Sequence, residues 1–336
     1  MQNEGFRSRA VGRDGTIIPL FSRFVKPFFA KGEKRRKRKG GGVDKKRDLW
    51  YTQKRAGRGE TPPQNGTDGK TRRRKEDGMA EEKKQGISPE HGQGTADVNA
   101  QRHLRQEMLF GDGTTALLRK KHVAVFGIGG VGGYAVEALA RSGVGSLTLV
   151  DRDAYSPSNL NRQLYATLST LGMTKVEAAR RRVAEIDPVI TVHAVNEFFL
   201  PETADRVDFS AFDYVIDAVD TVSAKVALVQ ACEAAGVPII SCMGTGNKTD
   251  PTAFRVSDIY KTTLCPLARA VRNACRRAGV RRLKCVYSEE APHRPPETLI
   301  DGESGKPIPA SCAFVPAAAG LILAGEAIKD LLKGEE

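Results

Sequence analysis

The chain has 336 residues, with 53 lysines and arginines against 40 acidic residues and a formal net charge of +13. This length suits one large domain or two medium ones. The charge is uneven, because residues 1–100 contain 25 basic and 13 acidic residues, whereas residues 101–336 contain 28 and 27. The global charge therefore does not identify a nucleic-acid-binding fold, since the larger part of the chain is close to neutral.

The first hundred residues have the composition of a disordered segment. Lys31–Gly42 and Thr71–Gly78 are blocks of charge with too few apolar residues to offset the entropy of ordering. The apolar patch Thr16–Ala30 contains two prolines and two cations, so it is too short and too interrupted for a membrane helix. We expect residues 1–100 to be a disordered basic tail. Removal as a transit peptide and translation from Met79 both remain open.

Strands and helices are expected to alternate from His122 onward. Short β-branched apolar runs predict buried strands, and the longer runs between them predict helices. Gly143 marks the end of the first helix, and Thr174 and Pro188 bound the second. This alternation predicts a Rossmann-like, doubly wound α/β fold with a mainly parallel sheet. The expected strands are His122–Phe126, Ser146–Asp151, Thr191–Val195, Tyr214–Val219 and Pro238–Met243.

The pattern changes after Asn247. Thr252–Tyr260 and Leu283–Ser288 predict strands on either side of a basic helix at Cys265–Gly279, and Phe314–Leu332 predicts a last helix. Charged residues interrupt the apolar run of this last helix, which favours a core or interface helix over a membrane span. Residues 248–336 are therefore expected to add a strand and basic-helix extension that binds substrate and contributes to a dimer.

A glycine-rich loop follows the first expected strand. Gly127, Gly129 and Gly132 fit G-x-G-x-x-G between a strand and a helix, a pattern that lets the backbone approach a phosphate closely. Asp151 ends the next strand, where it can accept a hydrogen bond from a ribose hydroxyl. The pattern predicts a nucleotide site and leaves NAD and ATP as alternatives.

Polar residues further along favour ATP. Asn159, Arg162 and Gln163 lie in the loop after the second strand, and Lys175 opens the following helix. A triphosphate requires such cations, whereas the two phosphates of NAD are served by the glycine loop alone. Asp220 follows a later strand, and its carboxylate suits Mg²⁺. These positions all fall at the carboxyl edge of the sheet, where ligands bind in such folds.

The six cysteines never form a C-x-x-C pair. We therefore expect reduced thiols in a cytoplasmic protein, with no zinc site.

Together these residues resemble the E1-like adenylating superfamily, the ThiF/MoeB/HesA group. The match consists of GIGGVGG, then D-x-D with SNLNRQ, then Lys175, and then DAVD with Asp220. The resemblance implies an adenylating domain over residues 101–336 that uses ATP and Mg²⁺. It assigns the ribose to Asp151, the magnesium to Asp220, and the phosphates to Asn159, Arg162, Gln163 and Lys175.

RHLRQ (Arg102–Gln106) resembles the leading R-x-x-R-Q of that superfamily. The resemblance implies a homodimer in which Arg105 of one chain reaches the nucleotide phosphates of the other.

The segment from SCMGTGNKTDP to CAFVPAAAGL resembles the TcdA (CsdL) branch, the tRNA threonylcarbamoyladenosine dehydratases. That branch implies ATP-dependent cyclisation of the threonylcarbamoyl group on the adenosine beside the anticodon. Three alternatives remain: adenylation of a ubiquitin-like sulfur carrier, an NAD(P)-dependent oxidoreductase, and a silent scaffold for a cysteine desulfurase or sulfur acceptor. The missing zinc ligands count against the first.

Basic residues without acids between them occupy the segment from Lys261 to Cys285. Arg269, Arg272 and Arg276 have the spacing of one helix face. A local basic stripe is typical of a nucleic-acid partner, which the resemblance implies is tRNA, and a solvated helix surface is the alternative. The candidate tRNA-binding residues are Lys261, Arg269, Arg272, Arg276 and Arg277, and the stripe continues through Arg281, Arg282 and Lys284.

Overall fold

Seven strands form one sheet in the order β3-β2-β1-β4-β5-β7-β6. The structure, a computed structural model, describes residues 101–300, 302, 305 and 307–333, so the expected tail over residues 1–100 lies outside the described residues. The strands are β1 (His122–Phe126), β2 (Ser146–Val150), β3 (Thr191–Val195), β4 (Tyr214–Asp217), β5 (Ile239–Cys242), β6 (Phe254–Asp258) and β7 (Lys284–Ser288).

The sheet is parallel except at one edge, where β6 runs antiparallel to β7. The chain moves outward from β1 to β3 in one direction and from β4 to β7 in the other. This reversal creates a crevice between the carboxyl ends of β1 and β4, which is where open α/β sheets bind ligands. The predicted doubly wound, mainly parallel fold is confirmed.

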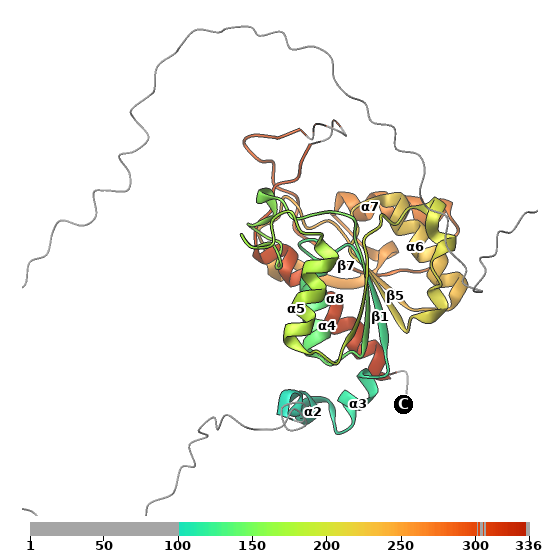
Figure 1. Cartoon of the computed structure of the whole chain (residues 1–336). Helices are drawn as coiled ribbons and strands as arrows, with labels where there is room; N and C mark the ends of the chain where they lie inside the picture. The colour runs from blue at the N-terminus through green and yellow to red at the C-terminus, as the bar shows by residue number, and fades with distance from the viewer. Residues whose placement is uncertain (1–100, 301, 303–304, 306, 334–336) are drawn as a thin grey trace, which may run out of the picture. The chain divides into compact units, whose positions relative to one another are not determined.

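Helices cover both faces of the sheet (Figure 1). Alternate side chains of β1 separate the two layers, because successive residues of a strand point to opposite faces. Val123 and Val125 join the core cluster of α4, α5 and α8, whereas Ala124 and Phe126 join that of α6. The helices are α2 (Leu104–Phe110), α3 (Thr114–Leu118), α4 (Gly132–Arg141), α5 (Lys175–Ile186), α6 (Val222–Ala235), α7 (Pro266–Arg277) and α8 (Phe314–Lys333).

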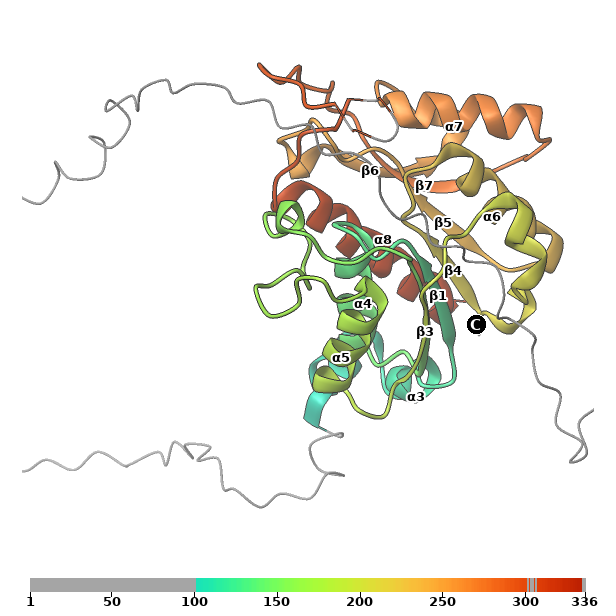
Figure 2. The same ribbon diagram turned by 45° about the horizontal axis from the view of Figure 1, so that its top comes forward.

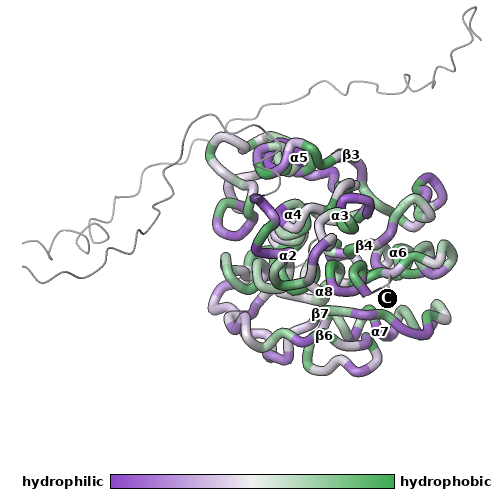
Figure 3. The backbone as a smooth tube through the Cα atoms, turned by 90° about the horizontal axis from the view of Figure 1, so that it is seen from below, coloured by the Kyte–Doolittle hydropathy of each residue, from purple (hydrophilic) through white to green (hydrophobic). Residues whose placement is uncertain are grey.

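The predicted last helix, α8, is a core helix that packs against α4. A Cβ at Gly320 would lie 2.2 Å from the backbone oxygen of Val131, so the two helices approach more closely than any side chain permits. Buried residues extend along α8 from Val315 to Leu331, and this apolar stretch is seen from below in Figure 3. In the described part of the chain no helix is long and apolar enough to cross a membrane.

The sequence predicted the ends of the helices and strands to within a few residues. Thr174 is the N-cap of α5 as expected, although its side chain makes no capping hydrogen bond. Gly143 follows α4 with φ of 83°, a conformation that glycine adopts without strain. β4 ends at Asp217, two residues earlier than expected, because the carboxylate of Asp217 turns back to accept a hydrogen bond from the Val219 N–H. The short helices α2 and α3 were not expected.

Candidate functional site

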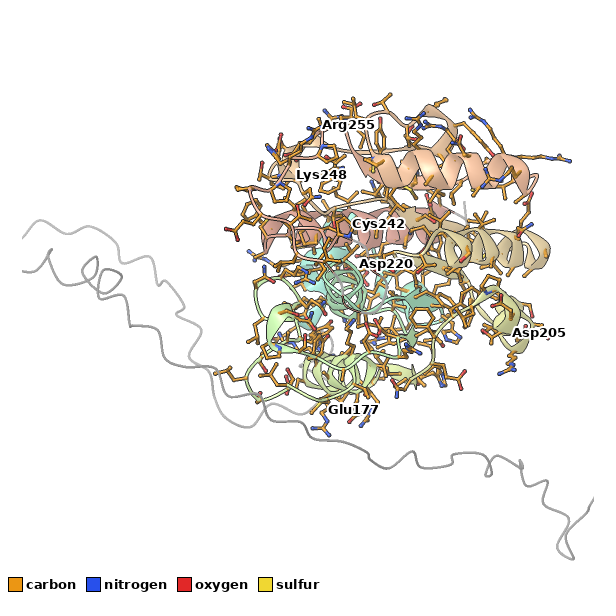
Figure 4. The ribbon with its side chains drawn as sticks, turned by 90° about the horizontal axis from the view of Figure 1, so that it is seen from above. Glu177, Asp205, Asp220, Cys242, Lys248 and Arg255 are labelled. Carbon is orange, nitrogen blue, oxygen red and sulfur yellow. The ribbon has the colours of Figure 1, made fainter. Side chains whose placement is uncertain are left out.

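A cavity of about 1230 Å³ lies at the carboxyl edge of the sheet. Its walls come from the glycine loop after β1, the segment between β2 and α5, the β4–α6 loop, the β5–β6 loop and the first residues of α7. This volume is large for a single small molecule and accommodates a nucleotide together with a second ligand. Figure 4 looks down on this edge, with Asp220, Cys242 and Lys248 following one another across its middle.

The glycine loop has no room for side chains at two of its three predicted positions. A Cβ at Gly127 would lie 2.7 Å from the backbone oxygen of Ala218, and one at Gly132 would lie 1.8 Å from the oxygen of Gly127. Gly129 faces open space, with Gln163 Nε2 at 3.9 Å as its nearest neighbour. The loop is therefore closed against β4 and open toward the cavity, where the N-terminus of α4 favours an anion.

Asp151 is fixed to the glycine loop. Its Oδ2 accepts a hydrogen bond of 2.7 Å from the Ile128 N–H, and its Oδ1 accepts one from the Asp153 N–H. Lys175 is buried, and its Nζ lies 2.7 Å from Asp153 Oδ2 and 3.6 Å from Asp151 Oδ2. Sequence reasoning missed Asp153 as the partner of Lys175. These carboxylates set where the ammonium group stands at the cavity wall.

Arg162 and Gln163 extend from the segment after β2 into the cavity lining. Arg162 Nη1 donates to the backbone oxygen of Ser158 and to Asn161 Oδ1, which leaves its other donors free. Gln163 is buried, and its Oε1 has no hydrogen-bond partner. Asn159 Oδ1 is occupied by the Ser156 N–H, so its amide group remains as a donor. An orphaned buried amide oxygen and unused donors are what a polar ligand would satisfy.

Asp220 is exposed at the cavity, and its only described hydrogen bond comes from Thr221 Oγ1 at 3.3 Å. Behind it lies a fully buried ion pair that sequence reasoning missed. Lys225 Nζ donates to both carboxylate oxygens of Asp217, at 3.0 and 3.1 Å, and Ser241 Oγ donates to Asp217 Oδ2 at 2.6 Å. This network anchors the end of β4 and leaves the Asp220 carboxylate free for a cation.

Arg105 does not line the cavity of its own chain. It is exposed on α2 and forms no hydrogen bond or ion pair within the described residues. Its neighbours in R-x-x-R-Q are bound inside the chain: Arg102 Nη1 pairs with Asp187 Oδ1, and Gln106 Nε2 donates to the Ser142 oxygen. Those contacts fix α2 and leave Arg105 available to another molecule.

The basic stripe is narrower than its sequence suggests. Lys284 is bound to α8, where it pairs with Glu326 and Asp330, so it does not contribute to an exposed basic surface. Arg272 is half-buried and donates to the backbone and hydroxyl oxygens of Thr262. The residues that remain exposed, without an ion pair in the described part of the chain, are Lys261, Arg269, Arg276, Arg277, Arg281 and Arg282. They follow α7 along the β6–β7 side of the sheet (Figure 2).

Cys242 lines the cavity beside Cys265, but it is poorly suited to be a nucleophile. Burial raises the pKa of the Cys242 thiol to about 12, and that of Cys285 likewise to about 12. Because the thiolate is the reactive form, these groups are almost entirely protonated near neutral pH.

We therefore expect single alanine substitutions of Cys242, Cys265, Cys285 and Cys312 to leave the cyclisation that the TcdA resemblance implies near the wild-type rate. The measurement is cyclised product, with adenylate formation followed in parallel. A variant that still forms adenylate but no longer cyclises would reveal a covalent thiol intermediate.

Comparison with known proteins places the chain among adenylating enzymes. The ThiF family model matches residues 101–336. A tRNA threonylcarbamoyladenosine dehydratase of Bacillus subtilis (strain 168) is 43% identical over 241 residues, covering 69% of this chain and 95% of that protein. A molybdopterin-synthase adenylyltransferase of Escherichia coli (strain K12) is 36% identical over 166 residues, covering 48% of this chain and 66% of that protein.

A solved structure agrees with the first of these relatives. The E. coli tRNA N6-threonylcarbamoyladenosine dehydratase TcdA, in complex with ATP, matches with a TM-score of 0.65 at 31% identity. The match covers 71% of this chain and 97% of that one. The family model, the relative that matches across nearly its whole length and the shared fold agree, and the chain belongs to the ThiF family, in its group of tRNA threonylcarbamoyladenosine dehydratases.

Proposed function

We infer that this protein is an ATP-dependent enzyme that cyclises N6-threonylcarbamoyladenosine in tRNA to its hydantoin form. The observation that carries this is the cavity, which joins the glycine loop, Asp151 and two cations at the switch point of a ThiF-family sheet. The 43% identity with a named dehydratase over most of the described chain supports the substrate. The carrier-protein adenylyltransferase shares less of the chain and is the weaker alternative.

The site divides between nucleotide and metal. We propose that Asp151 holds the ribose, while the glycine loop, Arg162 and Lys175 hold the phosphates. Asn159 and Gln163 add neutral hydrogen-bonding groups to this phosphate site, because their side-chain amide N–H groups can donate to phosphate oxygens. Asp220 would hold Mg²⁺, which supplies charge neutralisation where pyrophosphate leaves.

The reaction proceeds in two substitutions. A carboxylate oxygen of the substrate attacks the α-phosphorus of ATP, forming an acyl adenylate and releasing pyrophosphate. A nitrogen of the same threonylcarbamoyl group then attacks the activated carbonyl, loses its proton and expels AMP. The five-membered ring closes within one molecule, so its effective molarity can reach about 10⁵–10⁸ M. The enzyme has to exclude water, because hydrolysis would return the open acid.

The direct experiment compares two carboxylate substrates as acceptors of the adenylyl group of ATP. Purified enzyme is incubated with ATP, Mg²⁺ and either tRNA carrying threonylcarbamoyladenosine or a ubiquitin-like carrier protein. We expect AMP, pyrophosphate and a nucleoside lighter by one water with the tRNA alone. Adenylation of the carrier and none of the tRNA would support the alternative function.

We further propose that the enzyme works as a homodimer. Arg105 lies on α2 next to exposed apolar side chains, namely Leu104, Met108, Leu109 and Phe110. Exposing such a cluster of apolar side chains to water is unfavourable, and a second copy of the chain could cover it. In such a dimer, Arg105 of one chain would reach the cavity of the other chain, although it does not line the cavity of its own chain.

The tRNA would dock on the exposed basic surface of α7 and its neighbours. Reversing Arg269 and Arg277 to glutamate should abolish measurable tRNA binding while ATP affinity stays unchanged. The slope of log affinity against log salt should also become shallower, by about one unit for each phosphate that the variant no longer binds. Fluorescence anisotropy across a salt series is the measurement.

The matched control reverses Arg180 and Arg181 on α5, which changes the net charge equally on another part of the surface. If both double variants weaken tRNA binding to the same extent, binding follows net charge and the α7 surface is not the docking site.

Two further proposals depend on the substrate. Because tRNA is the substrate, we propose that the enzyme acts in the cytoplasm. Residues 248–336 contribute β6 and β7 to the sheet and add the helices α7 and α8, and we propose that they form the substrate and dimer side of the domain. No described contact favours a desulfurase or sulfur acceptor as a partner.

A further inference from the structure

Lys248 differs from the other buried lysines in the described part of the chain. Lys225 is fully buried and paired with Asp217, and Lys175 is buried and paired with Asp153. Lys248 is 3% exposed, but it has no acidic partner among the described residues. Burying a cation without a counter-charge is unfavourable, so this arrangement needs an explanation.

The contacts of Lys248 satisfy its hydrogen-bonding groups only in part and do not balance its charge. Nζ donates to the backbone oxygen of Gly244 at 3.0 Å and, weakly, to that of Ser288 at 3.5 Å. An ammonium group has three donors, so a third remains. Lys248 also lines the cavity. An anion in the cavity would supply both the missing acceptor and the missing charge.

The backbone beside Lys248 is held in a conformation that non-glycine residues rarely adopt. Asn247 has φ of 58°. It is held there by hydrogen bonds to two other loops, because its N–H and Oδ1 bind Ala310 and its carbonyl oxygen accepts from the His293 N–H. Strain maintained by several surrounding contacts is typical of positions whose side chain must be placed accurately.

The position of Lys248 in the cavity indicates whether it would bind the phosphates of ATP or an anionic group of the second ligand. Of its two backbone partners, Gly244 follows β5 and Ser288 ends β7. These strands lie three and four positions in the sheet from β2, which Asp151 follows, or about 14–19 Å at the usual strand spacing. The glycine loop, assigned to the phosphates, follows β1, and Asp220, assigned to Mg²⁺, follows β4. The N-terminus of α7 reaches the cavity on the same side as Lys248, through Pro266 and Leu267. That side is the one on which the proposed tRNA surface lies.

We propose that Lys248 receives the carboxylate of the substrate's threonylcarbamoyl group and holds it toward the α-phosphate of ATP. The proposal rests on the function inferred above. Lys248 remains protonated throughout, and one carboxylate oxygen stays bound to it while the other attacks phosphorus. Its positive charge selects an acid over a neutral group.

The test uses two RNA stem-loops that differ only in one group. One carries threonylcarbamoyladenosine, and the other carries the same nucleoside with its carboxylate converted to a neutral amide. Without ATP, the wild-type enzyme should bind the acid about tenfold to hundredfold more tightly than the amide, as expected for hydrogen bonds to a charged group. Lys248→Met should bind the two alike, while its affinity for ATP and its thermal unfolding midpoint stay close to wild type.

A second Lys248 variant and a control variant complete this experiment. Lys248→Gln keeps a donor for the backbone oxygens and removes the charge, so it should also lose the discrimination even if the methionine variant folds poorly. Lys120→Met removes one exposed lysine from the turn before β1 and should discriminate as the wild type does.

The outcomes separate the two levels of inference. The proposal would be overturned if both Lys248 variants still bound the acid stem-loop more tightly than the amide, as the wild type does. It would also be overturned if the variants lost affinity for ATP but still distinguished acid from amide, because Lys248 would then bind the nucleotide. Cyclised product from the wild type shows that the proposed function stands in either case. If the wild type forms no cyclised product from the acid and ATP, the proposed function itself is wrong.

Discussion

Asp220→Asn and Arg162→Ala should each lower AMP formation by about 10²–10³-fold, the usual effect of removing a group that stabilises charge at the reacting centre. Asp220→Asn removes the negative charge proposed to hold Mg²⁺, so its activity should recover partly at high Mg²⁺ concentration. Arg162→Ala removes a cation where negative charge develops on the departing pyrophosphate, and added metal should not restore it. The measurement is AMP release with modified tRNA, over a Mg²⁺ titration.

Neither substitution should unfold the protein. Asp220 is exposed, and Arg162 donates only to its own loop in the described structure. Asp205→Asn, at the periphery in Figure 4, is a matched control that should remain fully active. Turnover at the wild-type rate in either site variant would remove that residue from the proposed site.

The nucleotide loop was predictable because its determinants are local. Gly127 and Gly132 follow a strand at the fixed spacing of G-x-G-x-x-G, which was enough to predict both. The backbone contact that forbids a side chain at Gly132 comes from Gly127 in the same loop, whereas the one at Gly127 comes from Ala218 after β4 and was not predictable. The place of Asp151 in the site could be predicted from its position at the end of the next strand alone. Each of these predictions depends on a periodicity or a turn that a short window of sequence contains.

The ionic partners inside the site were not predictable in the same way. Lys175 binds Asp153 across 22 positions, and Lys225 binds Asp217 across 8. These pairs depend on where an element places its side chains in three dimensions, and not on the type of residue alone. Lys248 has partners still further along the sequence: its Nζ donates to Ser288, at the end of β7 and 40 positions away, and its backbone oxygen accepts from the thiol of Cys312, 64 positions away.

Helical spacing also overstated the basic stripe. A helix turns by about 100° per residue, so Arg272 is rotated by about 60° from Arg269, whereas Arg276 is rotated by only about 20°. That difference turns Arg272 toward Thr262 and leaves Arg269 and Arg276 at the surface. The short α2 was missed for a related reason, since its apolar side chains have no core in this chain to define their period.

The exposure of α2 leads to the other large effect that we expect, which is complementation between two inactive variants. Arg105→Ala should lose most activity, because the phosphates lose the cation that we propose a second chain supplies. Mixed with Asp220→Asn, it should recover about one quarter of the wild-type activity. Random pairing puts half of the chains in mixed dimers, and each mixed dimer contains one site with both residues intact.

The experiment requires proof that subunits exchange, which differently tagged chains and co-purification provide. Arg141→Ala is a suitable control for charge loss, since this exposed arginine pairs only with Glu137 on its own helix in the described structure. The Arg141→Ala variant should be active alone. In an equal mixture with Asp220→Asn, the activity should be only that of the Arg141→Ala chains. If exchange is demonstrated and the Arg105→Ala mixture is no more active than its components, Arg105 does not act across the dimer. The cavity would then have to draw its remaining cation from within one chain.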